Sequence, residues 1–321
     1  MKKIGLILSL AFVFASCSEK NQLILKSSTG RINSVLVVID NTEWDTEIGT
    51  TIKDIIREPV IGLPQPEVQL RTSQINPPNF NSLFENNRNL LFVGISNQND
   101  FKVTHNKYAS PQTIIAITGK DKAALIKTIQ ENADKLISVF KKSDIQVYQS
   151  KLSKNIWEKD AFKQLKNTTI SIPKDYLKVE KLPDFLWLRK YISKDGTLNI
   201  LAYSMPLPKG GTIDTSTILS LRDSIGKTHI PGQFKDTYMQ TSKALAPSFK
   251  SVIIDGVHTT ESRGLWEVKN DFMGGAFINY SFIDTKNKRV LCLDGFVYAP
   301  NQDKRDYIFE LEAIFKTLKL K

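Results

Sequence analysis

The ten residues Arg289-Val290-Leu291-Cys292-Leu293-Asp294-Gly295-Phe296-Val297-Tyr298 form a nearly continuous apolar run close to the end of the chain. Apolar side chains occupy both alternating sets of positions, so a strand over these residues would bury both of its faces. A strand of this kind is unsuited to a sheet edge that faces water. We therefore predict that residues 289–298 form the central strand of a sheet.

Further strands and helices are predicted on either side of this run. The strands are expected at 168–172, 185–192, 197–203, 251–257, 262–268 and 275–283, and the helices at 214–228, capped by Asp214, and 303–319. A further helix is indicated by Trp157, Ala161 and Leu165 at four-residue spacing. The glycine in Ser193-Lys194-Asp195-Gly196 can supply the left-handed residue of a hairpin turn between two of these strands. This half of the chain is therefore predicted to be an antiparallel sheet flanked by helices.

The first half of the chain shows short apolar runs that alternate with amphipathic segments. We predict strands at 31–40, 68–71, 90–95 and 113–118, and helices at 46–57, 79–86 and 120–142. Strands that alternate with helices at this spacing are typical of an α/β layer. Residues 143–151 are polar and lack the helical periodicity, so we place a domain boundary within them.

Together these patterns predict an α+β protein of two domains. An N-terminal α/β domain at 31–145 precedes a C-terminal antiparallel α+β domain at 146–321, built as an α/β/α sandwich. The 321 residues are enough for two cores, and a composition of 41% hydrophobic and 24% charged residues is ordinary for a globular protein.

The beginning of the chain has the features of an export signal. Lys2 and Lys3 precede the apolar segment Ile4–Phe14, which only Gly5 and Ser9 interrupt. Eleven helical residues rise about 16 Å, which is too short for a hydrocarbon layer of ~30 Å. Since no later segment is long and apolar enough to span a bilayer, we expect the mature protein to lie on a membrane without crossing it.

Phe14-Ala15-Ser16-Cys17 resembles the lipobox of bacterial lipoproteins, with phenylalanine in place of the usual leucine. In that motif the cysteine receives diacylglycerol before the signal is cut in front of it. The resemblance implies a signal peptide at 1–16, lipidation of Cys17 and a tether at 17–30. Two or three acyl chains anchor a protein stably, at about 0.8 kcal/mol per buried CH₂. The alternative is an ordinary secretory signal followed by a chance cysteine.

The charge balance and the cysteines fit an exported protein. Loss of residues 1–16 leaves 42 of the 44 basic residues against 33 acidic ones. Behind an export signal, this surplus favours anionic lipids or cell-wall polymers over nucleic acid as neighbours. The lysines form no run longer than two, which also fits an ordinary solvated surface. With Cys17 lipidated, Cys292 is the only thiol left, so no intramolecular disulfide is expected.

The sequence contains no recognisable catalytic or metal-binding motif. His105, His229 and His258 lie in no His-Glu-x-x-His frame, and there is no Gly-x-Ser-x-Gly elbow. Cys292 falls within the predicted central strand, where a thiol is inaccessible. We therefore expect no catalytic residue, cofactor or metal. A hydrolase that uses carboxylates of the C-terminal domain remains the alternative, and those carboxylates are Asp255, Glu261, Glu267, Asp271 and Asp294. Asp294 is more often a buried structural residue in such a setting.

Three residues are candidates for binding. Arg263 and Trp266, in Arg263-Gly264-Leu265-Trp266, precede Phe272-Met273-Gly274-Gly275. Together these stretches could form an edge for an acidic or sugar ligand; alternatively, Trp266 is a core residue and the glycines make a turn. Trp44 follows the first predicted strand, where α/β folds place ligands, although it too can be a packing residue.

Several stretches resemble one family of Bacteroidetes lipoproteins that is catalogued as a domain of unknown function. They are the lipobox, Arg31-Ile32-Asn33-Ser34, Leu63-Pro64-Gln65, Arg88-Asn89, Ile230-Pro231-Gly232, Arg263-Gly264-Leu265-Trp266, Met273-Gly274-Gly275 and Gly295-Phe296-Val297-Tyr298-Ala299-Pro300. The resemblance implies a lipoprotein of the cell envelope, in the outer membrane, and supplies no reaction. In the order of its elements, the C-terminal half is also similar to the PsbP/Mog1-type sandwich.

The function favoured by these observations is a non-catalytic binding or assembly factor. Its expected partners are the membrane, through the N-terminal lipid, and an envelope protein or anionic polymer; nucleic acid is not expected. The alternative from a different class is an envelope hydrolase that acts on glycan or peptide.

Overall fold

The computed structural model describes residues 25–152 and 168–320. The expected signal peptide, Cys17 and a helix expected around Trp157 lie outside the described residues, so lipidation stays a prediction. Within the two described ranges, none of the helices has both the length and the apolar composition needed to cross a bilayer.

The C-terminal domain is built around β16 (Arg289–Tyr298), as predicted for this run. Its eight-stranded sheet has the order β12-β14-β15-β16-β11-β10-β9, with β13 paired to β14. The other strands are β9 (Leu177–Leu182), β10 (Phe185–Tyr191), β11 (Thr197–Pro206), β12 (Met239–Thr241), β13 (Ser248–Ile254), β14 (Val257–Val268) and β15 (Gly274–Asp284). All of these pairs are antiparallel, and β16 pairs with β11 and β15 without a break in register.

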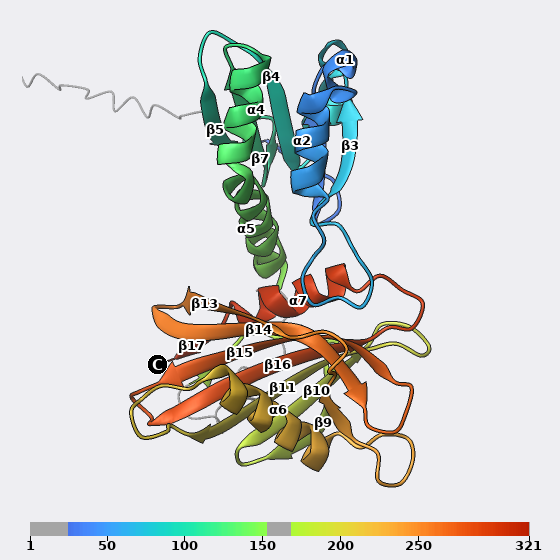
Figure 1. The fold of residues 1–321 in the computed structure, drawn as a ribbon, viewed down its shortest axis with the longest axis vertical. Helices are drawn as coiled ribbons and strands as arrows, with labels where there is room; N and C mark the ends of the chain where they lie inside the picture. Colours follow the sequence, from blue (N-terminus) through green and yellow to red (C-terminus); the bar gives the residue numbers. More distant parts are fainter. Residues whose placement is uncertain (1–24, 153–167, 321) are drawn as a thin grey trace, which may run out of the picture.

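One helix covers each face of this sheet (Figure 1). α6 (Thr215–His229) begins at the predicted cap, Asp214, whose side chain accepts from the Thr217 N–H. α7 (Arg305–Phe315) lies on the opposite face, and it approaches so closely that a Cβ on Gly295 would lie 2.8 Å from Leu311. This arrangement confirms the predicted α+β class. A short strand pair, β8 (Thr168–Thr169) with β17 (Lys319–Leu320), completes the domain.

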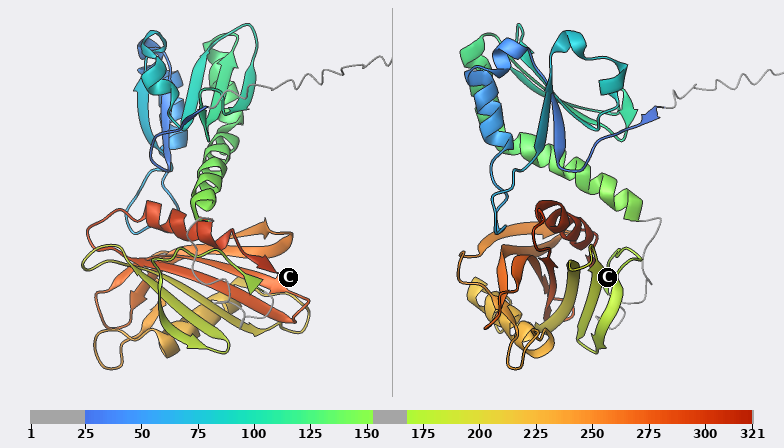
Figure 2. Two further views of the ribbon diagram at one scale, coloured as in Figure 1. Left: turned by 180° about the vertical axis from the view of Figure 1, so that it is seen from behind. Right: turned by 90° about the vertical axis from the view of Figure 1, so that its right-hand side faces the viewer.

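The N-terminal domain has a five-stranded sheet in the order β3-β2-β4-β7-β5. Its strands are β2 (Ser34–Val38), β3 (Arg71–Ile75), β4 (Asn89–Ile95), β5 (Asp100–His105) and β7 (Thr113–Gly119), of which β5 runs antiparallel to β7. One face carries α2 (Glu47–Ile56), α4 (Lys122–Glu131) and α5 (Ala133–Leu152), as Figure 2 shows. The remaining elements are α1 (Asn41–Trp44), η1 (Pro77–Asn79), α3 (Ser82–Glu85) and the pair β1 (Lys26–Ser27) with β6 (Ala109–Ser110).

Several predicted element ends differ from those observed. The helix expected at 120–142 breaks at Asn132 and then continues to Leu152, beyond the polar stretch where we placed a domain boundary. That stretch stays helical because two of its polar residues face inward: Asp144 is fully buried and bonds to Arg88, and buried Ser143 accepts from Thr113. The strand expected at 68–71 lies at 71–75, and the edge strands β5 and β9 were not predicted.

The two domains are joined through the amino end of α7. The segment 57–70, hereafter the connector, descends from the N-terminal domain to α7 (Figure 1). Within it, a Glu67 carboxylate accepts from the backbone N–H groups of Lys304 and Arg305, at 2.6 and 2.9 Å. Arg71 in β3 pairs with Asp306 at 2.7 Å. The first turn of α7 therefore obtains its hydrogen-bond acceptors from the other domain.

We predict that Glu67→Ala lowers the free energy of unfolding by about 1–2 kcal/mol, because it removes a cap from two backbone N–H groups at once. Urea denaturation measures the change. The matched control is Glu58→Ala, which removes an exposed glutamate of the same connector and should change stability by less than about 0.5 kcal/mol. Equal effects of the two substitutions would contradict the capping role.

Candidate functional site

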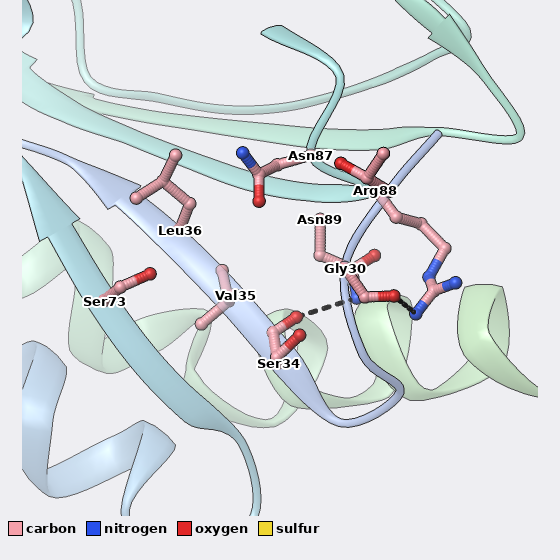
Figure 3. Close-up of a pocket in the computed structure, with 9 residues that line it drawn as sticks. Gly30, Ser34, Val35, Leu36, Ser73, Asn87, Arg88 and Asn89 are labelled. Atoms are coloured by element: carbon pink, nitrogen blue, oxygen red, sulfur yellow. Dashed lines mark hydrogen bonds between the residues drawn. The ribbon is translucent and has the colours of Figure 1, made fainter. Parts of the chain in front are cut away.

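The stretches that carried the family resemblance meet at two places in the structure. The first is a polar cluster at the amino ends of β2 and β4 (Figure 3). Arg88 donates to Asp144 at 2.8 Å and to the Gly30 carbonyl at 3.0 Å, while the Asn89 amide donates to the Ser34 carbonyl at 3.0 Å. The adjoining cavity measures about 30 Å³, which is room for about one water molecule. This cluster therefore ties strands to α5 and offers no space for a larger ligand.

The second meeting place is a cavity of about 350 Å³ beside the hairpin of β14 and β15. We call it the hairpin pocket. Pro64 of the connector forms one wall, and Trp266, Glu267, Asp271 and Met273 of the hairpin form the others. The N-terminal segment Leu63-Pro64-Gln65 thus lies against the two C-terminal stretches singled out as a candidate edge. A pocket of this volume, lined by both apolar and polar side chains, falls in the size range of ligand sites.

Local geometry explains the combination of tryptophan and glycines in this hairpin. Trp266 and Gly275 are direct partners across β14 and β15. A Cβ on Gly275 would lie 2.1 Å from the Val297 carbonyl oxygen and 2.9 Å from Trp266 Nε1. Only glycine leaves the space through which the indole N–H donates to that carbonyl, at 3.1 Å. The glycine is therefore required for the position of the tryptophan.

Trp266 is a core residue, as the alternative interpretation of the sequence had it. Its side chain is buried and packs edge-on against Phe296, with ring centroids 5.3 Å apart. Trp266 borders the hairpin pocket, but its buried side chain is not the exposed contact that a binding edge requires, and the binding edge itself stays a prediction. The residue exposed at the rim is Phe272, which is fully accessible.

Arg263 does not contribute to the pocket, contrary to the prediction. Its guanidinium is held by Glu261 and by Glu312 of α7, at 2.7 Å in each case, and the side chain is largely buried. Tyr280 donates to the second oxygen of Glu261. Although burial alone would raise it, Arg263 and Lys316 hold the pKa of Glu312 well below its ordinary value. With both carboxylates engaged, the arginine is structural and unavailable to an acidic ligand.

Trp44 lies far from the other two candidates, at the end of the N-terminal domain remote from the C-terminal one (Figure 1). It ends α1 and packs partly buried against the core under α2. Lys53 lies 4.3 Å from the centroid of its ring and donates to its carbonyl at 2.7 Å. These contacts make Trp44 a packing residue, and the structure does not bring it together with Arg263 or Trp266.

The carboxylates considered for hydrolysis are mostly engaged elsewhere. Asp294 is fully buried, unbulged, and bonded to Arg222 at 2.8 Å and to Asn279 at 3.1 Å. Burial raises the pKa of Asp294, and Arg222 opposes that rise. It is a structural residue, as expected. Within residues 25–152 and 168–320, no group of His, Cys, Asp and Glu is arranged to hold a metal ion.

Two carboxylates border the hairpin pocket, which sequence reasoning did not anticipate. Glu267 accepts from the Gln240 amide at 2.9 Å. Asp271 accepts from the Phe272 N–H at 2.6 Å through one oxygen, while its other oxygen is buried without a partner in the described structure. The sequence placed both residues in the C-terminal sheet, but their meeting with Pro64 depends on the course of the connector, which no local pattern reveals.

We predict that Gly275→Ala lowers the free energy of unfolding by more than about 2 kcal/mol, because the new Cβ overlaps a strand carbonyl and displaces Trp266. Urea denaturation and tryptophan fluorescence measure the effect. The control is Gly94→Ala, since a Cβ there meets no atom within 4 Å; its stability should stay within about 0.5 kcal/mol. If Gly275→Ala were as mild as the control, the close packing described would be wrong.

Comparisons with known proteins give families and distant structural likenesses. Residues 28–153 match the model of a domain of unknown function (DUF8532), and residues 155–317 match another domain of unknown function (DUF4837). No curated protein matches the sequence significantly.

Three solved structures illustrate the likenesses of fold. The Ran-binding protein Mog1p of Saccharomyces cerevisiae is 9% identical, with a TM-score of 0.32 over 48% of this chain and 90% of that one. LpqN of Mycobacterium tuberculosis, described as involved in cell envelope biogenesis, is 14% identical, with a TM-score of 0.30 over 48% and 83%. A protein of Bacteroides thetaiotaomicron is 11% identical, with a TM-score of 0.27 over 48% and 45%. Because the match over residues 155–317 takes in half of the sequence, the chain belongs to the family of the domain of unknown function DUF4837.

Proposed function

We propose that this protein is a non-catalytic binding or assembly factor of the bacterial cell envelope, anchored through a lipid on Cys17, and that its partner binds at the hairpin pocket. The observation that carries the proposal is the pocket itself, about 350 Å³ in volume and bordered by the fully exposed ring of Phe272. An exposed aromatic ring beside a cavity is a typical anchor for a partner.

The charges around the pocket favour a protein partner over an anionic polymer. Glu267 and Asp271 border it, and Arg263, which would have attracted an anion, is neutralised by two glutamates. An acidic rim repels a polyanion and attracts a lysine or arginine. The partner is therefore a protein segment that presents an apolar side chain next to a positive charge.

The hydrolase alternative keeps one specific support. Glu267 and Asp271 lie on the same cavity, whereas Glu261 and Asp294 are held in ion pairs with arginines. An acid–base mechanism would thus depend on Glu267 and Asp271. The test is hydrolysis of a glycan or peptide by the purified protein. If that activity were found, and were lost in both Glu267→Gln and Asp271→Asn, the protein would be a hydrolase and not a non-catalytic binding factor.

The lipid anchor is tested by Cys17→Ala in the full-length protein. We expect mass spectrometry to find the wild type without residues 1–16 and with acyl chains on Cys17, and Cys17→Ala without acyl chains, because the thiol is their acceptor. Ser18→Ala, which retains the thiol, is the control and should carry the acyl chains. A wild-type protein without acyl chains would contradict the anchor.

The pocket is tested by extracting the tagged lipoprotein in gentle detergent and identifying what co-elutes in stoichiometric amount. We expect Phe272→Ala to reduce the retained partner at least tenfold, as loss of an interface anchor does. Phe234→Ala is the control, because that ring is also exposed in the same domain and should have no effect. A partner retained equally by Phe272→Ala would show that it binds elsewhere.

A further inference from the structure

The N-terminal sheet has one face that its helices leave uncovered. Residues 77–87 lie over half of that face, where Phe80 and Phe84 pack on Leu36, Leu90 and Ile114. Beyond them, at the carboxyl ends of β2, β4 and β7, lies an apolar cavity of about 260 Å³. We call the surface around this cavity the open face. It is on the side opposite α2, α4 and α5 (Figure 2).

The open face carries an exposed apolar side chain, that of Leu83 in α3, which is 79% exposed. Phe84, the next residue, points into the cluster beneath α3, so Leu83 points away from the sheet. Ile95, 52% exposed at the end of β4, alternates with Leu91 and Val93 and therefore lies on the helix side. A Cβ on Gly94 would meet nothing within 4 Å, which shows how open the floor of the cavity is.

Exposed lysines flank the same face. Phe101 and Val103 of β5 pack into the core on the helix side, so Lys102 between them projects to the open side. Lys107 lies in the turn between β5 and β6, and Lys26 pairs with Ala109 of β6. All three lysines are exposed. Asp100, two residues before Lys102 on the same strand, projects to the same side and offsets part of this positive charge.

The position of β1 connects this face to the proposed anchor. The described chain begins at Leu25, next to β1, which pairs with β6 beside Lys107. Cys17 precedes Leu25 by eight residues, and a chain of that length reaches at most about 28 Å. A lipid on Cys17 therefore keeps β1, and with it this side of the N-terminal domain, within a short distance of the bilayer.

We propose that the open face of the N-terminal domain lies against the membrane, with Leu83 in the interfacial region and Lys26, Lys102 and Lys107 on anionic headgroups. The inference rests on the proposed lipidation of Cys17 and adds an orientation to it. Apolar side chains that enter the headgroup boundary, ringed by lysines, are the usual features of a peripheral membrane surface. The occupant of the apolar cavity is then lipid.

The orientation is tested with the lipidated full-length protein in vesicles of phosphatidylcholine and phosphatidylglycerol. An environment-sensitive fluorophore is attached at Leu83→Cys, and as a control at Lys127→Cys on the helix side, where the side chain is 74% exposed. Cys292 stays unlabelled, because burial raises the pKa of its thiol to about 12. We expect a blue shift at position 83 and none at 127.

The lysines are tested in a protein that begins at Ser18, without signal and lipid, where membrane binding depends on the surface alone. Each lysine near an anionic surface contributes about fivefold to binding. Replacing Lys26, Lys102 and Lys107 together by Gln should therefore weaken binding to the same vesicles at least tenfold. The matched control replaces Lys122, Lys127 and Lys142, which are exposed residues of α4 and α5 on the helix side, and should leave most of the binding intact.

The outcomes separate the orientation from the anchor. Vesicle-bound protein with no blue shift at position 83 overturns the orientation and leaves the anchor standing. Wild-type protein that fails to stay on vesicles contradicts the anchor, and the lysine comparison then decides the orientation alone. Equal losses of vesicle binding in the two triple variants also overturn the proposed orientation.

Discussion

The double ion pair of Arg263 with Glu261 and Glu312 is the contact on which the junction of the two domains depends. Burying three charges is costly unless each is paired and hydrogen-bonded. Here the Arg263 guanidinium forms ion pairs with Glu261 of its own strand and with Glu312 of α7, both at 2.7 Å. The pairing fixes α7 along β14, and the N-terminal domain is in turn attached to α7. Removing either glutamate would leave a buried charge uncompensated.

The connector follows from this arrangement. Gly62 lies directly on the arginine, since a Cβ there would be 2.8 Å from Arg263 Cβ, and its backbone has a φ of +84°. Both conditions favour glycine. With the connector held at Gly62, Pro64 is placed against the β14–β15 hairpin and Glu67 against the amino end of α7. The packing of Gly62 on Arg263 thus determines both a wall of the hairpin pocket and the cap of α7.

The sequence predicted those parts of the fold in which a local pattern and the tertiary structure agree. The doubly apolar run of β16, the pairing of β10 with β11 and the Asp214 cap of α6 are such cases. The prediction that Gly196 supplies a left-handed residue in the turn between β10 and β11 was wrong, because its φ is not positive. It did not predict the end of α5, because Asp144 looks like a surface residue until its pairing with Arg88, 56 residues away, is known. Arg263 was misjudged for the same reason: its partner Glu312 is 49 residues distant. Long-range charge pairing leaves no periodicity, so both the domain junction and the composition of the pocket required the structure.

The distribution of charge separates the two proposed surfaces. The formal net charge of +11 is that of the whole chain, yet the hairpin pocket is bordered by Glu267 and Asp271 and the open face by three lysines. Because charges at a surface act over about 8 Å at physiological ionic strength, each surface is governed by its own residues and not by the total. An anionic bilayer is attracted to the first domain and repelled by the pocket of the second. The pocket would then remain free of lipid and open to a positively charged protein segment, even in a protein held close to the membrane.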